Sequence, residues 1–278
     1  MIPKLIVFGG NGFLGKRICQ EAVTSGYQVV SVSRSGKAPH SNELNDKQWM
    51  QEVQWTAADI FKPDSYHELL NNATNVVHSL GILLENENYK QTLSKSPTYD
   101  SKSRLLSFGA GPNPLKKSSP YFTYEMMNKQ SAIILADTFK QKILKKSKKE
   151  QEKANQRSFT YISADKGFPL IPSGYINSKR EAEIELEKMQ RYFRPIIVRP
   201  GFMFDEHRNA IGPRSFIHTA LELLYCGNKF LLRNKLQLLN DLIRPTVSTQ
   251  QVSKSVLKNI ENPDFKGVVT LEEILKAE

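Results

Sequence analysis

Tyr175 and Lys179 are the residues whose types and spacing best suit chemistry. They stand at positions i and i+4, a spacing that places both side chains on one face of a helix. An ammonium beside a phenol favours the phenolate, which makes the tyrosine a usable general acid toward a carbonyl oxygen. Ser163, at the end of an expected strand, could orient that carbonyl. The predicted catalytic residues are therefore Ser163, Tyr175 and Lys179, and an ordinary pair on a helix surface is the alternative.

A glycine-rich segment near the N-terminus offers a site for phosphates. Residues 9–15 read Gly-Gly-Asn-Gly-Phe-Leu-Gly, directly after an apolar run and before a helical pattern. Gly9 permits a tight turn, Gly12 lets a pyrophosphate approach the backbone, and Gly15 lets the helix pack close to the strand. The helix N-terminus adds N–H groups and partial positive charge. The predicted binding residues are Gly9, Asn11, Gly12, Phe13, Leu14 and Gly15, and a glycine-rich turn without a ligand is the alternative.

The residues after the second expected strand decide which dinucleotide fits. A carboxylate there would accept hydrogen bonds from the ribose hydroxyls and favour NAD. The chain instead has Ser33, Arg34 and Ser35, and a guanidinium with two hydroxyls suits a 2′-phosphate. We therefore expect NADP(H) to be preferred over NAD(H), unless Arg34 is an ordinary surface arginine. Asp59, after the third expected strand, is placed either to contact the adenine or to cap a helix.

The elements that must position these residues alternate between strand and helix. Short apolar runs predict strands, and apolar residues three and four apart predict helices. This alternation indicates an α/β protein, a Rossmann-type doubly wound parallel sheet with a small C-terminal subdomain on the substrate side. Strands are expected at 4–8, 28–33, 53–57, 75–80, 159–163, 195–199 and 267–271, and helices at 13–25, 65–71, 126–144, 177–190, 215–240 and 248–260.

Composition suggests how the chain is organised. Residues 1–200 would form the dinucleotide-binding domain, and residues 201–278 a substrate-side region partly interleaved with the sheet. The net charge is +11, and +8 of it falls in residues 82–157, a polar basic insertion that includes the lysine-rich run 145–153. This insertion could meet nucleic acid, anionic lipid or an acidic protein, or form a solvated face.

Several classes of protein are excluded by composition. Two cysteines, Cys19 and Cys226, cannot build a disulfide framework or a four-cysteine zinc site. The five histidines lack metal-ligand spacing, so no metal is expected. No apolar run approaches the roughly 20 residues that span a bilayer. The lysines of 145–153 lack interleaved aromatic residues, so nucleic acid is not an expected partner.

The motifs together carry a family resemblance. The chain resembles a short-chain dehydrogenase/reductase of the extended or atypical, epimerase-like kind, and the resemblance covers nearly its whole length. Similarity lies in the glycine segment, the Tyr–Lys pair, Ser163, Asp59, the run 76–81, Asn128, and Arg199-Pro200-Gly201. The cofactor-binding residues that this resemblance implies also include Leu80, Gly81, Asn128 and Pro200, with Lys179 holding the nicotinamide ribose.

Within the family, the chain is most similar to a mitochondrial branch that includes reductase-like proteins of ubiquinone (coenzyme Q) biosynthesis. That resemblance implies a mitochondrial protein on the matrix side, peripheral to the inner membrane and attached to a ubiquinone-biosynthesis enzyme complex. It also implies a lipid-like quinone intermediate as a candidate substrate. A cleavable presequence is not expected, because the first strand begins at residue 4. Two function classes remain, an NADP(H)-dependent oxidoreductase and a catalytically silent nucleotide-binding scaffold of that complex.

Overall fold

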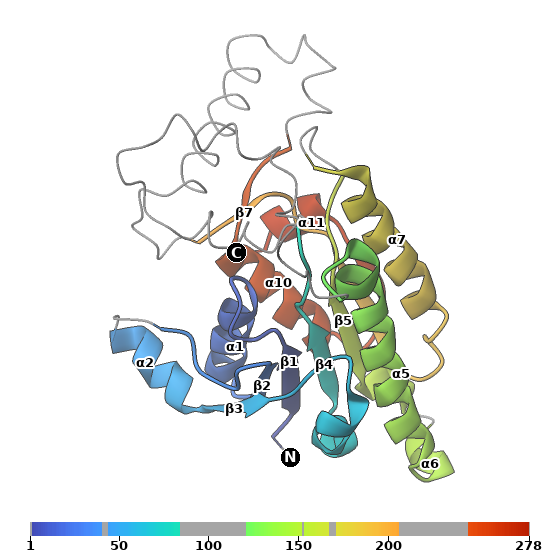
Figure 1. The fold of residues 1–278 in the computed structure, drawn as a ribbon. Helices are drawn as coiled ribbons and strands as arrows, with labels where there is room; N and C mark the ends of the chain where they lie inside the picture. The colour runs from blue at the N-terminus through green and yellow to red at the C-terminus, as the bar shows by residue number, and fades with distance from the viewer. Residues whose placement is uncertain are drawn as a thin grey trace, which may run out of the picture.

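The protein was analysed as a computed structural model, shown in Figure 1. The structure describes residues 2–40, 44–83, 121–151, 153–166, 171–205 and 244–277. The expected helix at 215–240 and most of the polar segment at 85–122 lie outside the described residues.

A seven-stranded sheet forms the centre of the molecule, and each pair of neighbouring strands is parallel. The strand order is β3-β2-β1-β4-β5-β6-β9. The order therefore reverses between β1 and β4, which is where open α/β sheets bind their ligands, beyond the carboxyl ends of the strands. The strands are β1 (Lys4–Phe8), β2 (Gln28–Ser33), β3 (Val53–Ala57), β4 (Asn75–His78), β5 (Ser158–Ile162), β6 (Arg194–Val198) and β9 (Gly267–Val269).

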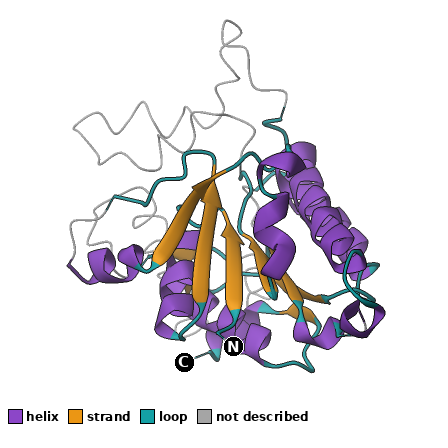
Figure 2. Ribbon diagram, turned by 90° about the horizontal axis from the view of Figure 1, so that it is seen from below, coloured by secondary structure: helices purple, strands orange, loops and turns teal. Residues whose placement is uncertain are grey.

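Alternation along the buried strands builds two separate cores, one on each face of the sheet. In β1, Leu5 and Val7 belong to one cluster, whereas Ile6 and Phe8 belong to the other. This is the period of two that a strand imposes on its side chains. Because every residue of β4, β5 and β6 is buried, helices must cover both faces, and Figure 2 shows helices on both sides of the sheet.

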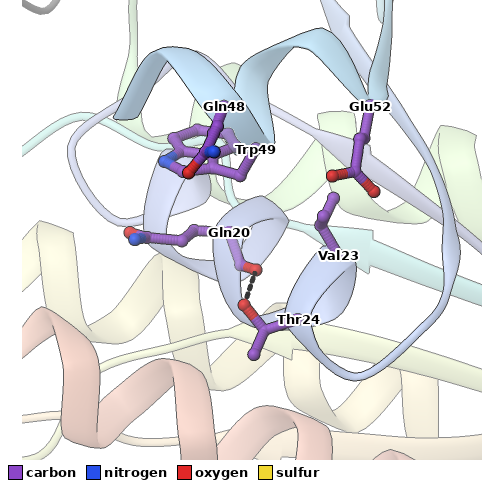
Figure 3. A pocket seen from close by; sticks show the side chains of 6 residues that line it. All are labelled: Gln20, Val23, Thr24, Gln48, Trp49 and Glu52. Carbon is purple, nitrogen blue, oxygen red and sulfur yellow. Dashed lines mark hydrogen bonds between the residues drawn. The ribbon is translucent and has the colours of Figure 1, made fainter. Parts of the chain in front are cut away.

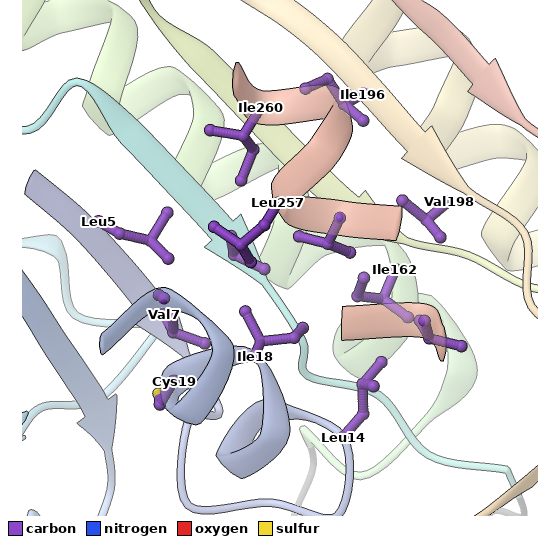
Figure 4. Close-up of a cluster of buried hydrophobic side chains, with 14 of the residues drawn as sticks. Leu5, Val7, Leu14, Ile18, Cys19, Ile162, Ile196, Val198, Leu257 and Ile260 are labelled. Carbon is purple, nitrogen blue, oxygen red and sulfur yellow. The ribbon is translucent and has the colours of Figure 1, made fainter. Parts of the chain in front are cut away.

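The first core lies under α1 (Gly15–Thr24), α2 (Leu44–Gln51), α10 (Thr249–Glu261) and α11 (Leu271–Leu275). Figure 4 shows Ile18 of α1 and Leu257 of α10 facing strand residues in this core. The second core lies under η2 (His67–Asn72), α5 (Ser131–Leu144) and α7 (Ser173–Glu187). These layers confirm the predicted Rossmann-type doubly wound fold.

Helices near the site differ in detail from the expectation. The predicted helix 65–71 is a pair of 3₁₀ turns, η1 (Pro63–Ser65) and η2. The predicted helix 126–144 begins as a π-helical turn, η4 (Glu125–Gln130), before α5. The helix expected at 177–190 begins at Ser173, so that Tyr175 lies in its first turn.

The C-terminal region shares the main sheet and also contains a smaller one. The two-residue strands β7 (Met203–Phe204) and β8 (Val247–Ser248) pair in parallel beside the sheet, while β9 extends the sheet itself. The lysine-rich run does not continue α5, which ends at Leu144; α6 (Lys148–Gln151) and the 3₁₀ turn η5 (Ala154–Gln156) follow it. Within the described residues, no helix is long and apolar enough to cross a membrane, and no cluster of ligating side chains suits a metal ion.

Candidate active site

The glycine segment forms a tight loop between β1 and α1. Gly9 has φ +87°, and its amide donates to the Val32 carbonyl at 2.8 Å. The Gly12 amide donates to the Gly9 carbonyl at 2.9 Å, which closes the turn. A Cβ at Gly15 would lie 2.1 Å from the Gly9 carbonyl oxygen, so this glycine is required for the helix to pack against the loop.

Gly12 differs from Gly15 because it is exposed. The one atom within 4 Å of a Cβ built there is the Gly9 carbonyl oxygen, at 3.0 Å. The loop therefore presents bare backbone to the outside at Gly12, beside the N-terminus of α1. This is the geometry that a pyrophosphate needs to reach helix amides.

Gly10 is a requirement that the sequence reasoning missed. A Cβ on Gly10 would lie 2.3 Å from the Ser31 Oγ atom and 2.9 Å from the Cys19 Sγ atom. Gly10 is thus fixed by close packing of the loop onto β2 and α1, below the exposed side of the loop. The doubled glycine at positions 9 and 10 was the available signal.

The end of β2 lies next to the glycine loop. The Asn11 side-chain amide donates to the Ser35 Oγ atom at 3.3 Å, and the Ser33 and Ser35 hydroxyls are 3.4 Å apart. Arg34, between these serines, is exposed. The structure therefore brings the three residues predicted to select the dinucleotide to the edge of the loop predicted to hold its phosphates.

Asp59 makes a local turn. Its Oδ1 atom accepts a hydrogen bond from the Phe61 amide at 3.1 Å, and its own amide donates to the Ser65 hydroxyl at 3.1 Å. These contacts close a local turn and do not cap a helix N-terminus, so they match neither of the two expected roles. The side chain is half-buried at the carboxyl end of β3.

Lys179 lies inside the protein at the carboxyl end of β5. Its Nζ atom donates to the Ile162 carbonyl at 2.7 Å and lies 4.7 Å from the centre of the Tyr161 ring. Burial lowers the pKa of this amine to about 7. We expected an ammonium directed at the Tyr175 phenol; the hydrogen bond to Ile162 and the contact with the Tyr161 ring place the amine beside β5.

Tyr175 occupies the first turn of α7 and is half-buried. Its ring meets the Tyr124 ring edge-on, with centroids 6.2 Å apart. Tyr124 in turn donates from its hydroxyl to the Leu83 carbonyl at 3.0 Å. Tyr124 therefore links the loop after β4 to Tyr175 in the first turn of α7.

The loop after β4 is held against Lys179 by Asn128. The Ile82 amide donates to Asn128 Oδ1 at 2.8 Å, and Asn128 Nδ2 donates back to the Ile82 carbonyl at 3.2 Å. A Cβ at Gly81 would lie 3.0 Å from Asn128 Oδ1 and 3.1 Å from Lys179 Nζ. Gly81, Asn128 and Lys179 therefore come together as predicted, and Asn128 supports the loop backbone.

His78 is a buried, uncharged neighbour of Lys179. His78, at the end of β4, has its Nε2 atom 2.8 Å from the Ser131 hydroxyl. Burial lowers the pKa of His78 to about 3, so the ring is uncharged at neutral pH.

Leu80 is half-buried and would meet a Cβ on Gly9 at 2.9 Å. Pro200 is buried, and its carbonyl accepts from the Asp165 amide at 2.9 Å.

Ser163 differs from its expected role. Its hydroxyl donates to the Glu183 carboxylate, and its oxygen accepts from Arg180 at 3.2 Å. It lies at the predicted place after β5, but its only proton is directed at Glu183 and not at a substrate carbonyl. Glu183 was not singled out from the sequence, where it follows Lys179 by four positions.

A surface depression of about 450 Å³ lies between α1 and α2, away from these residues. Figure 3 shows Trp49 and Gln48 of α2 facing Gln20 of α1 across it. None of the predicted site residues lines this depression. The candidate site is therefore the carboxyl edge of the sheet, where the loops after β1, β2, β4 and β5 meet.

Known proteins match the chain in sequence and in structure. A sequence profile of the NAD dependent epimerase/dehydratase family matches residues 5–95, which include β1 to β4 and the glycine loop. An uncharacterized chloroplastic protein of Arabidopsis thaliana is 26% identical over 279 residues, which cover 99% of this chain and 77% of that protein.

Solved structures share the fold at low identity. An oxidoreductase of the short-chain dehydrogenase/reductase family from Burkholderia thailandensis has a TM-score of 0.56 at 10% identity, covering 97% of this chain and 90% of its own. The UDP-glucose 4-epimerase of Thermus thermophilus, complexed with NAD, has a TM-score of 0.54 at 13% identity. The match covers 96% of this chain and 77% of that one. The dTDP-4-dehydrorhamnose reductase of Bacillus anthracis, complexed with NADP, has a TM-score of 0.52 at 13% identity, and the match covers 97% of this chain and 74% of that one.

The sequence of residues 5–95 is thus similar to the NAD dependent epimerase/dehydratase family. The chain as a whole has the Rossmann-type fold of epimerases and short-chain reductases.

Proposed function

We propose that the protein is an NAD(P)-dependent oxidoreductase of the short-chain dehydrogenase/reductase type that prefers NADP(H). The proposal rests on one observation: the glycine loop and Lys179 lie at the same edge of the sheet. The exposed backbone of the loop at Gly12 lies after β1, and Lys179 lies beside Gly81 after β4, on the other side of the strand-order reversal. A dinucleotide laid across that reversal reaches both.

Each part of the site has a task in this proposal. The residues 9–15 and the N-terminus of α1 bind the pyrophosphate. Ser33, Arg34 and Ser35 bind a 2′-phosphate, for which a guanidinium offers paired donors. Lys179 hydrogen-bonds the nicotinamide ribose, and Gly81 leaves room for it.

The chemistry at the substrate carbonyl falls to Tyr175. A nicotinamide cofactor supplies hydride to a carbonyl carbon when it is bound. Tyr175 donates its phenolic proton to the carbonyl oxygen, and the nearby amine of Lys179 favours the phenolate that results. Both groups lie on α7, whose first turn opens at the sheet edge.

For the substrate, we propose a lipid-like quinone intermediate of ubiquinone biosynthesis. The support is the family resemblance of the motifs, which also underlies the proposed mitochondrial, matrix-side location at the inner membrane and the attachment to a ubiquinone-biosynthesis complex. The Arabidopsis relative is described as chloroplastic, which leaves the compartment open to direct test. Fractionation of cells that express the tagged chain tests the location, and co-purification with ubiquinone-biosynthesis enzymes tests the partner.

Tyr175→Phe tests the enzymatic reading. The change removes the proton donor and keeps the ring that packs against Tyr124. General acid catalysis contributes about 10²–10⁴-fold, so oxidation of NADPH with quinone precursors should fall by that factor while the dissociation constant for NADPH stays unchanged. Absorbance of NADPH and calorimetric titration measure the two quantities.

One control variant and one contradicting outcome complete this test. Tyr192→Phe removes a phenol elsewhere in the same fold and should change neither quantity. Equal turnover in the wild type and Tyr175→Phe would contradict the role of Tyr175 as the acid.

A nucleotide-binding scaffold is the second candidate. One observation favours it, namely that the hydroxyl of Ser163 donates to Glu183 and so does not offer its proton to a carbonyl. A scaffold would bind NADPH and lose complex assembly in a Gly12→Val variant, yet would keep its cellular function in Tyr175→Phe.

A further inference from the structure

Glu183 is a buried carboxylate at the centre of a polar cluster beside the site. It lies on α7 one turn after Lys179, and 3% of its surface is exposed. Its Oε1 atom accepts from the Ser163 hydroxyl, from Arg180 at 2.6 Å and from Arg199 Nε at 3.2 Å. Its Oε2 atom accepts from Arg199 Nη2. The cluster links α7 to the ends of β5 and β6.

The two arginines differ from the glutamate in exposure. About 30% of each side chain, 29% for Arg180 and 30% for Arg199, reaches solvent, against 4% for Glu183. Buried ion pairs of this kind add little net stability, because desolvation offsets the attraction. A purely stabilising role therefore explains poorly why a charged cluster is built next to Ser163 and Lys179.

We propose that Glu183 is the positioning residue of this active site, because it fixes the direction of the Ser163 hydroxyl and holds a negative charge one turn from Lys179. The proposal rests on the oxidoreductase function proposed above. Arg180 and Arg199 hold the Glu183 carboxylate in place through hydrogen bonds to both of its oxygens. Arg180 also donates to the Ala164 carbonyl at 2.9 Å, which ties the loop after β5 to the same cluster.

The first consequence concerns Ser163. A serine hydroxyl has one proton and two lone pairs. The proton goes to Glu183, and one lone pair accepts from Arg180. The remaining lone pair makes Ser163 an acceptor toward substrate, which suits a hydroxyl group on the substrate rather than a bare carbonyl oxygen.

The second consequence concerns the charge of Lys179. The groups that act on its charge come from three elements: Glu183 on α7, Tyr161 on β5 and His78 on β4. Burial raises the pKa of Tyr161 well above 10 and lowers that of His78 to about 3, so both are neutral near pH 7. Glu183 favours the protonated amine, while burial opposes it. Glu183 therefore helps Lys179 to stay positively charged, and a charged amine donates a stronger hydrogen bond to a ribose.

The test measures the dissociation constant of NADPH against pH in variants of the whole chain. Binding should weaken as Lys179 loses its proton, with a midpoint near 7 in the wild type. Glu183→Gln should move the midpoint down by about one pH unit, because the favourable charge is lost. Glu183→Asp should restore it. Glu187→Gln is the matched control, since Glu187 is exposed one turn further along α7, and it should leave the midpoint unchanged.

A second variant covers the case in which Glu183→Gln does not fold. Arg199→Gln removes one of the two guanidiniums around Glu183, so the carboxylate acts more strongly on Lys179 and the midpoint should rise. Midpoints equal to that of the wild type in every variant that folds would overturn the positioning role while NADPH still binds. Failure of the wild type itself to bind NADPH would instead overturn the proposed function.

Discussion

At the residue scale, the site depends on glycines and on one buried amine. Gly12 and Gly15 were expected to serve different purposes, phosphate approach and helix packing, and their surroundings differ accordingly. Gly12 is exposed and its missing side chain leaves space outside the loop, whereas Gly15 is buried against the Gly9 carbonyl. The charge of Lys179 changes near neutral pH, because burial lowers the pKa of its amine to about 7.

Substitution of the two glycines separates binding from folding. Gly12→Ala should weaken NADPH binding at least about tenfold, because its Cβ enters the space needed by a phosphate. It should lower the thermal midpoint less than Gly15→Ala does, since its Cβ would lie 3.0 Å from the Gly9 carbonyl oxygen. Gly15→Ala places a Cβ 2.1 Å from a carbonyl oxygen and should lower the thermal midpoint as well as binding. Calorimetry and thermal unfolding of both variants measure the effects. A Gly12→Ala protein that binds NADPH as tightly as the wild type would show that the loop does not hold phosphate.

Lys179 makes stability depend on pH. Its pKa falls from 10.5 in the unfolded chain to about 7 in the folded one. Between these values the unfolded chain binds more protons, so Lys179 makes the free energy of unfolding rise with pH in this window. Lys179→Met should remove that rise, as measured by urea unfolding between pH 7 and 9. Lys188→Met, at an exposed lysine near the end of α7, should keep it. The same slope in Lys179→Met and the wild type would contradict the buried titration.

At the element scale, much of the fold could be predicted from the sequence. Expected strands match β1, β2 and β3 in both bounds, because apolar runs bounded by glycine and polar residues leave little choice. The π-helical turn η4 was not predicted; it contains Asn128, whose contact with the loop after β4 joins residues 46 positions apart. The helix α2 was missed because its apolar residues show little periodicity. The pairing of β7 with β8 joins residues far apart in the chain.

The site was predicted unevenly for the same physical reason. The glycine loop, Arg34 and the Tyr175–Lys179 pair could be proposed from the sequence, because chain neighbours or one helical turn define them. Glu183 contacts Ser163 and Arg199, which directly follow β5 and β6 and lie near Glu183 only in the folded chain. Spacing along the sequence carries no record of such long-range contacts.

Arg194, the first residue of β6, is a buried arginine that connects several backbone segments. It is buried at 4% exposure, and its guanidinium donates to five backbone carbonyls, those of Asn155, Asn259, Ile260, Asn262 and Phe265. These include carbonyls at the C-terminus of α10, which have no partners inside the helix. The residue therefore joins η5, β6 and α10.

Removal of this guanidinium should be strongly destabilising. Arg194→Met keeps the apolar stem but leaves buried carbonyls without donors, so the free energy of unfolding should fall by about 2–4 kcal/mol. Chemical denaturation measures the change. Arg191→Met, at an exposed arginine three positions earlier, is the control and should fall within about 0.5 kcal/mol of the wild type. A loss of similar size in both variants would argue against the capping role.

At the scale of the whole molecule, the sheet order brings distant segments to one edge. Four parts of the chain meet beside the reversal between β1 and β4. They are the glycine loop, the end of β2, Gly81 and Lys179. Part of the basic charge of residues 82–157 is neutralised within the fold. Lys129, Lys140 and Lys142, in the described part of this insertion, all pair with carboxylates. Any anionic partner of the insertion would therefore have to meet its other basic residues.

Calorimetric titration of the wild-type protein with NADPH and with NADH tests the central claim most directly. The account predicts one dinucleotide per chain and tighter binding of NADPH. Arg34→Glu should weaken NADPH binding by about 1–3 kcal/mol and leave NADH nearly unaffected, because the charge acts on the 2′-phosphate alone. Lys37→Glu, a charge reversal at an exposed lysine nearby, gauges the general electrostatic effect. Absence of binding to either dinucleotide would contradict the account, and equal affinities that Arg34→Glu does not change would contradict the preference for NADP(H).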